Sequence, residues 1–105
     1  MSAILLERRA AHAVLTLNRP EKRNPLPYLP AHGLLPALKD LAADRAMRAV
    51  VLTGAGPAFC SGLDLDALRG FQKATPAQNL ADSRKIRDFF EYLRAYPKPL
   101  VAAVQ

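Results

Sequence analysis

Residues 50–65 have the sequence VVLTGAGPAFCSGLDL, in which an apolar, β-branched run passes into a glycine-rich turn. A continuous apolar run, here residues 49–53, predicts a strand buried on both faces, as in a parallel sheet. Gly54, Gly56 and Pro57 end that run because glycine and proline favour turns. In α/β proteins, ligands often bind where a strand passes into such a turn. The predicted fold class is α/β, with candidate site residues in the turn.

Two strands and a helix are predicted before this segment. Residues 3–7 and 13–17 are short apolar runs separated by a charged stretch, which predicts two strands of a β-hairpin or meander. Residues 20–30 hold four of the nine prolines and are expected to form a stiffened loop. Apolar residues at helical spacing predict a helix over residues 34–43, in which Pro36 can occupy the first turn.

A long helix and another strand are predicted after the turn. Residues 64–68 are expected to form a short helix, and residues 76–96 a longer one that Thr75 caps, with Pro76 at its first position. Residues 100–104 predict a second buried strand. Because no helix follows to cover that strand, we expect the folding unit to be incomplete. The apolar face of the long helix is expected to comprise Leu80, Ile86, Phe89, Phe90 and Leu93.

The composition is that of a globular domain. The 105 residues carry 15 Lys plus Arg against 9 Asp plus Glu, a net charge of +6. Half of the residues are hydrophobic, and this composition excludes disorder and collagen-like repeats. No apolar run approaches the roughly 20 residues that span a bilayer, so we expect no membrane segment and a cytoplasmic location. A single cysteine, Cys60, excludes an internal disulfide and is expected to be a buried small hydrophobe. Two histidines form no predicted metal cluster.

The basic residues are scattered and alternate with acids, which argues against a dedicated nucleic-acid binder. Their excess favours an anionic partner such as phosphate or a nucleotide-bearing cofactor.

Three motifs follow one another along the chain. They are LNRPEKRN at residues 17–24, VVLTGAGPAFCSGLDL at residues 50–65 and YPKPLVAAV at residues 96–104. In order and spacing this set resembles the crotonase superfamily, the enoyl-CoA hydratase/isomerase family. The resemblance begins near Ala13 and continues to the last residue.

The resemblance implies a crotonase-like spiral of ββα units, incomplete at the C-terminus, with residues 1–105 as the N-terminal part of a single domain. It implies acyl-CoA thioesters as the partner, with coenzyme A as part of the substrate and no separate cofactor or metal. It also implies a homotrimer or hexamer for the full-length parent. Members of the family stabilise an enolate at the thioester carbonyl with two backbone N–H donors, which are aimed in advance at charge that grows during reaction.

By position in the family motif, the first of these donors is the backbone N–H of Leu63. Gly62 can adopt backbone conformations closed to other residues, which lets the next N–H turn toward a ligand. Ser61, Asp64 and Leu65 complete the segment expected to bind substrate. From the residues alone, the segment could also be an ordinary strand-to-helix turn. For Asp64, a helix-capping role is favoured over catalysis.

Residues 18–24 resemble the loop with which relatives hold the nucleotide end of coenzyme A. Lys22 and Arg23 offer donors to its phosphates, Lys22 as a point charge and Arg23 through a bidentate contact. The alternative for these side chains is a solvated basic surface loop. Pro25 and Pro27 depart from the family pattern, in which Ala-Leu and a helix-starting Ser or Thr are common here.

The resemblance places the second oxyanion donor, and the acid/base carboxylates, beyond Gln105. We therefore assign no general acid or base. The expected parent activity is enoyl-CoA hydration or isomerisation, and we expect the isolated chain to be inactive. Two alternatives stay open: a non-catalytic module that binds CoA or acyl-CoA, and a truncated gene product without independent function.

Overall fold

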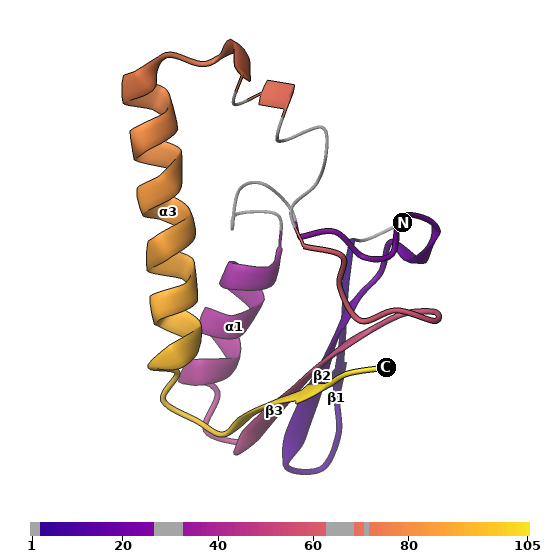
Figure 1. The fold of residues 1–105 in the computed structure, drawn as a ribbon. Coiled ribbons are helices and arrows are strands. Elements are labelled where there is room, and N and C mark those ends of the chain that lie inside the picture. The colour runs from indigo at the N-terminus through magenta and orange to yellow at the C-terminus, as the bar shows by residue number, and fades with distance from the viewer. Residues whose placement is uncertain (1–2, 27–32, 63–68, 71) are drawn as a thin grey trace.

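A four-stranded sheet in the order β1-β2-β3-β4 forms one layer of the molecule, and two helices lie along one of its faces (Figure 1). The predicted hairpin is confirmed, because β1 (Ile4–Arg8) pairs antiparallel with β2 (His12–Leu17). Strand β3 (Ala49–Gly54) lies parallel to β2, and β4 (Leu100–Ala103) lies parallel to β3. The computed structural model describes residues 3–26, 33–62, 69–70 and 72–105.

Because β2, β3 and β4 are parallel, their carboxyl ends meet at one edge of the sheet. Leu17 pairs with Gly54, and Thr53 pairs with Ala103. The loop that follows β2, the turn that follows β3 and the end of the chain after β4 therefore start side by side. Ligands of open α/β sheets bind at this kind of edge.

The core lies between the sheet and helices α1 (Leu34–Ala43) and α3 (Pro76–Arg94). Alternate residues of β2 are buried, as expected of a strand with one face on the core. Both predicted helices are confirmed, with α3 ending two residues before the predicted end. The predicted cap is also confirmed, since Thr75 and Gln78 form a reciprocal capping box at the start of α3. The buried apolar side chains are Ala13, Leu15, Leu17, Leu34, Leu38, Leu41, Met47, Val50 and Phe89.

The segment between α3 and β4 holds the C-terminal end of α1 in place. The Lys98 Nζ donates to the carbonyl oxygens of Leu41 and Asp44, at 2.6 Å each. The Tyr96 hydroxyl donates to the Leu38 carbonyl at 2.6 Å. These bonds satisfy carbonyl groups near the end of α1, some of which a helix C-terminus leaves without an intrahelical partner.

Two expectations about burial are wrong. Leu80 and Phe90 of the predicted apolar face of α3 are exposed. Leu80 lies in the N-terminal half of α3, which extends past α1 (Figure 1). Phe90 lies in the C-terminal part, but it follows the buried Phe89 directly, and successive helix residues point in different directions. Strand β4 is mostly exposed instead of buried, because it is an edge strand of the described sheet and only Leu100 packs against the core. The predicted short helix over residues 64–68 lies outside the described residues.

Candidate functional site

The loop of residues 18–26 and the turn of residues 54–62 meet at the carboxyl edge of the sheet. The Ala55 N–H donates to the carbonyl of Leu17 at 2.8 Å, which continues the pairing of β2 and β3 into the turn. A short 3-10 helix, η1 (Pro20–Lys22), follows β2, and Arg23 ends it in the left-handed conformation with φ 59°. This geometry returns the chain toward the turn.

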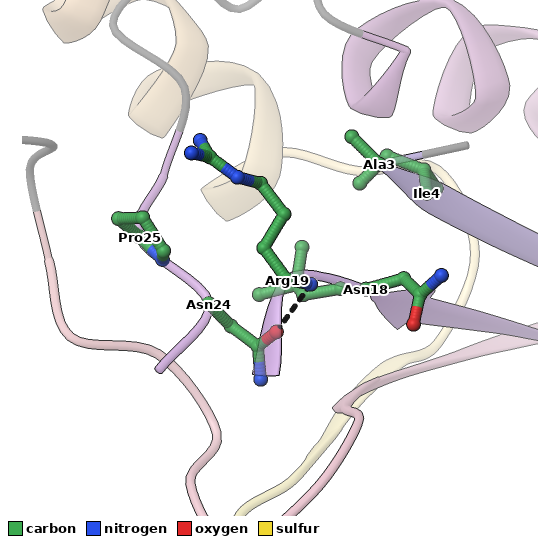
Figure 2. Close-up of a pocket in the computed structure, with 7 residues that line it drawn as sticks. Ala3, Ile4, Asn18, Arg19, Asn24 and Pro25 are labelled. Carbon is green, nitrogen blue, oxygen red and sulfur yellow. Dashed lines mark hydrogen bonds between the residues drawn. The ribbon is translucent and has the colours of Figure 1, made fainter. Parts of the chain in front are cut away.

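Asn24 links the loop to the turn from a fully buried position, with 1% of its surface exposed. Its Oδ1 accepts from the backbone N–H of Arg19 at 2.8 Å, as Figure 2 shows. Its Nδ2 donates to the carbonyl oxygens of Ala55 and Ala58, at 2.9 Å each. Both amide protons and the amide oxygen thus have partners, as a buried polar group requires.

Gly54 is the position at which this packing tolerates no side chain. A Cβ there would lie 2.6 Å from the Ala58 carbonyl oxygen and 2.8 Å from the Asn24 Nδ2, and it would also meet the Phe59 carbonyl oxygen. Real Cβ atoms essentially never approach heavy atoms this closely. The glycine that ends β3 therefore allows the turn to fold back over the strand.

Two further hydrogen bonds join the loop and the turn. The Leu26 N–H donates to the Gly62 carbonyl at 2.7 Å. The Ser61 hydroxyl donates to the Lys22 carbonyl at 3.4 Å. The two segments that the motifs assign to substrate binding are therefore in direct contact. Pro25, which departs from the family pattern, is buried and does not prevent this contact.

The end of the chain holds the turn from the other side. The Gln105 Nε2 donates to the Gly54 carbonyl, and it lies 3.3 Å from the Gly56 carbonyl oxygen. The Thr53 hydroxyl donates to the Ala103 carbonyl at 3.0 Å, so that β3 and the segment after β4 are also joined through a side chain.

The described site residues that the sequence predicted all lie at this edge. Lys22, Arg23 and Ser61 are exposed, and Gly62 has φ 93°, the left-handed conformation expected of it. Their roles toward a substrate stay predictions. The other predicted site residues, Leu63, Asp64 and Leu65, lie outside the described residues.

A small pocket of about 10 Å³ lies beneath the loop (Figure 2). This volume is about what a single water molecule needs, so the pocket cannot hold part of a nucleotide. The pocket is lined by Ala3, Ile4, Leu17, Asn18, Arg19, Asn24 and Pro25.

In the described part of the chain, no group of three or more His, Cys, Asp and Glu side chains could hold a metal ion. Cys60 is half-buried against the core, and its Sγ lies 3.4 Å from the Gly62 N.

Comparison with known proteins places this chain in a family. The model of the enoyl-CoA hydratase/isomerase family matches residues 7–105. The chain belongs to the enoyl-CoA hydratase/isomerase family.

Three relatives illustrate the likeness of this family member to others. A Thermus thermophilus protein named as a candidate enoyl-CoA hydratase is 48% identical over 92 residues, which are 88% of this chain and 36% of that protein. The 1,2-epoxyphenylacetyl-CoA isomerase of Escherichia coli is 38% identical over 86% of this chain and 35% of its own length. The solved structure of an enoyl-CoA hydratase/isomerase from Xanthobacter autotrophicus Py2 has a TM-score of 0.85 and 36% identity over 99% of this chain and 39% of that one. This chain thus spans less than half the length of these relatives.

Sequence reasoning missed the two residues that shape the site of this enoyl-CoA hydratase/isomerase family member. Asn24 and Gln105 were given no role, although Asn24 ends the first motif. A signal for Asn24 was present, because asparagine tolerates the left-handed conformation better than most residues do, and Asn24 has φ 54°. No local signal distinguished Gln105, since its partners are more than 45 residues away in the chain.

No helix in the described part of this family member is both long and apolar enough to cross a membrane.

Proposed function

We propose that this chain forms the acyl-CoA-binding part of an enoyl-CoA hydratase or isomerase that acts through an oxyanion hole. The observation that supports it most is the direct contact between the loop of residues 18–26 and the turn of residues 54–62, through Asn24 and through Leu26 with Gly62. A ligand that extends from one segment to the other could engage both, as a molecule with a phosphate-bearing end and a thioester end requires.

The roles of the residues follow from their chemistry. Lys22 and Arg23 bind the phosphates of coenzyme A, because their exposed cationic side chains offer charge-assisted hydrogen bonds. The backbone N–H of Leu63 donates to the thioester oxygen as negative charge builds there. Ser61, Gly62, Asp64 and Leu65 complete the segment that binds the substrate. Coenzyme A enters as part of the substrate, with no separate cofactor or metal.

Calorimetric titration of the chain with coenzyme A tests the binding part of this proposal. Replacing Lys22 and Arg23 together by Ala raises the Kd at least tenfold, about 1.4 kcal/mol, because two phosphate contacts are lost. The control replaces Arg84 and Lys85, exposed on α3, by Ala; it removes the same charge and leaves the Kd unchanged. Equal effects of the two double variants, or no binding by the unaltered chain, would contradict the proposal.

Turnover is expected to be absent from the 105-residue chain in isolation. One backbone donor without its counterpart and without a positioned acid or base gives little stabilisation of the transition state. Measured hydration of crotonyl-CoA by the purified chain would refute this expectation. Binding without hydration agrees with both parts of the proposal.

Two properties of the full-length parent are also proposed, a trimeric or hexameric assembly and a cytoplasmic location. Mass measurement and cell fractionation of that parent test them.

A further inference from the structure

The turn of residues 54–62 is held by its carbonyl groups, and the donors are two side-chain amides. The Asn24 Nδ2 lies 2.9 Å from each of two carbonyl oxygens, and the Gln105 Nε2 contacts two others. Of these four bonds, none belongs to a helix or a strand pairing. The four carbonyls are those of Gly54, Ala55, Gly56 and Ala58.

The two amides reach the turn from different parts of the chain. Asn24 comes from the loop after β2, and Gln105 comes from the segment after β4. In an exposed turn the carbonyl groups accept hydrogen bonds from mobile water. Here they accept hydrogen bonds from side-chain amides instead. The conformation of the turn therefore depends on two distant segments. Asn24 lies 31 residues from its partner Ala55, and Gln105 lies 49 and 51 residues from its partners Gly56 and Gly54.

The orientation of the Asn24 amide is determined by its partners. Rotating the amide by 180° would place its oxygen against the carbonyl oxygens of Ala55 and Ala58, and its NH₂ against the N–H of Arg19. The position therefore needs one acceptor and two donors on a short side chain, which asparagine supplies and aspartate does not.

We infer that Asn24 and Gln105 are positioning residues, whose amides fix the turn of residues 54–62 and thereby set its affinity for an acyl thioester. The second half of this inference rests on the proposed function. Donors that stabilise growing charge work best when they need no rearrangement during reaction, and a turn with four bound carbonyls has little freedom to rearrange. Free coenzyme A lacks the thioester, so its affinity depends on the loop of residues 18–26 more than on the turn.

Two isosteric variants, Asn24→Asp and Gln105→Glu, test the inference because each removes the donors and keeps the shape. Hydrogen–deuterium exchange of the unliganded chain reports on the turn itself. We expect exchange of the amides of residues 55, 56 and 58–62 to rise about tenfold in each variant, while the amides of α3 keep their rates; Pro57 has no amide hydrogen. The matched control is Gln78→Glu: it makes the same chemical change, but the Gln78 Oε1 only accepts, from the Thr75 N–H, so a carboxylate preserves that bond.

Ligand binding, measured well below the unfolding temperature, separates positioning from general stability. We expect Gln105→Glu to raise the Kd for crotonyl-CoA about tenfold and the Kd for free coenzyme A less than twofold. Replacing Lys22 and Arg23 by Ala raises both by the same factor.

The outcomes are distinguishable. Unchanged exchange in the turn of both variants overturns the inference, as does an equal loss of affinity for the two ligands in Gln105→Glu. If Asn24→Asp fails to fold, Gln105→Glu decides, because Gln105 is exposed and outside the core. If the unaltered chain binds neither ligand, the proposed function fails, whereas faster exchange would still establish that the amides fix the turn.

Discussion

Gly54 and Gly62 lie at the two ends of the same turn, and each is glycine for a different reason. A Cβ on Gly54 would overlap the Ala58 carbonyl oxygen and the Asn24 amide, so we predict that Gly54→Ala costs about 3 kcal/mol of unfolding free energy, as overpacking does. A Cβ on Gly62 meets nothing within 4 Å, and only its φ of 93° opposes substitution, so Gly62→Ala costs about 1 kcal/mol. Urea denaturation measures both values, and a larger loss for Gly62→Ala would contradict the assignment of the close contact to Gly54.

At the scale of single residues, the sequence suggested chemical roles and missed contacts between distant segments. Lys22, Arg23 and Gly62 could be given candidate roles, which stay predictions, because a cationic pair and a glycine before a donor have recognisable functions. Its residue type marked Asn24 as a candidate for the left-handed conformation, but its role could not be assigned, because that role is a pair of hydrogen bonds to a turn 31 to 34 residues further along the chain. A buried amide is recognised only when its partners are known.

The Asp44 carboxylate, directly after α1, accepts hydrogen bonds from the turn that follows the helix and from Arg8 of β1. The pKa of Asp44 is held below its usual value of 3.8, first because the Ala46 N–H donates to its Oδ1 at 3.0 Å. Arg8 lowers this pKa further, because it donates a hydrogen bond to the carboxylate and attracts its charge. Partial desolvation of the carboxylate opposes these effects and raises the pKa. A lowered folded-state pKa stabilises the fold above pH 3.8, and the stabilisation is lost as the pH falls through the folded-state value.

We therefore predict that Asp44→Asn lowers the urea midpoint at pH 7 and that the difference from the unaltered chain shrinks below pH 3.8. Asp40→Asn, which removes an exposed charge from α1 just before Asp44, serves as the control. A difference that stays constant from pH 7 to below pH 3 would show that the charge of Asp44 does not stabilise the folded state.

Helices and strands were predictable as elements, and their surroundings were not. Periodicity located α1, α3 and all four strands, because local spacing of apolar residues sets secondary structure. Periodicity also placed Phe90 on a buried face and β4 in a buried strand, and both are exposed. An apolar side chain is buried only where another element reaches it: the core covers the side of α3 that carries Phe89 and Leu93, and Phe90 lies off that side.

Over the whole molecule, the total accessible surface exceeds what a compact monomer of this mass exposes. The chain has 6722 Å² of accessible surface, whereas a compact monomer of its mass, 11.5 kDa, exposes about 5,800 Å². Large apolar side chains contribute to the excess: Val101 is 54% exposed and Phe90 is 50% exposed. Val101 lies in β4, one of the two edge strands of the described sheet, where unpaired backbone groups favour pairing with a second chain.

We predict that the 105-residue chain self-associates through β4. In sedimentation equilibrium its average mass should rise with concentration, and Val101→Lys should shift that rise to at least a fivefold higher concentration, because a charge on an edge strand opposes pairing. Gln72→Lys adds the same charge at an exposed polar position and should leave the curve in place. If Val101→Lys and Gln72→Lys behave alike, net charge and not the edge strand controls association. A monomer at every concentration would mean that the exposed apolar surface is too dispersed to hold two chains together.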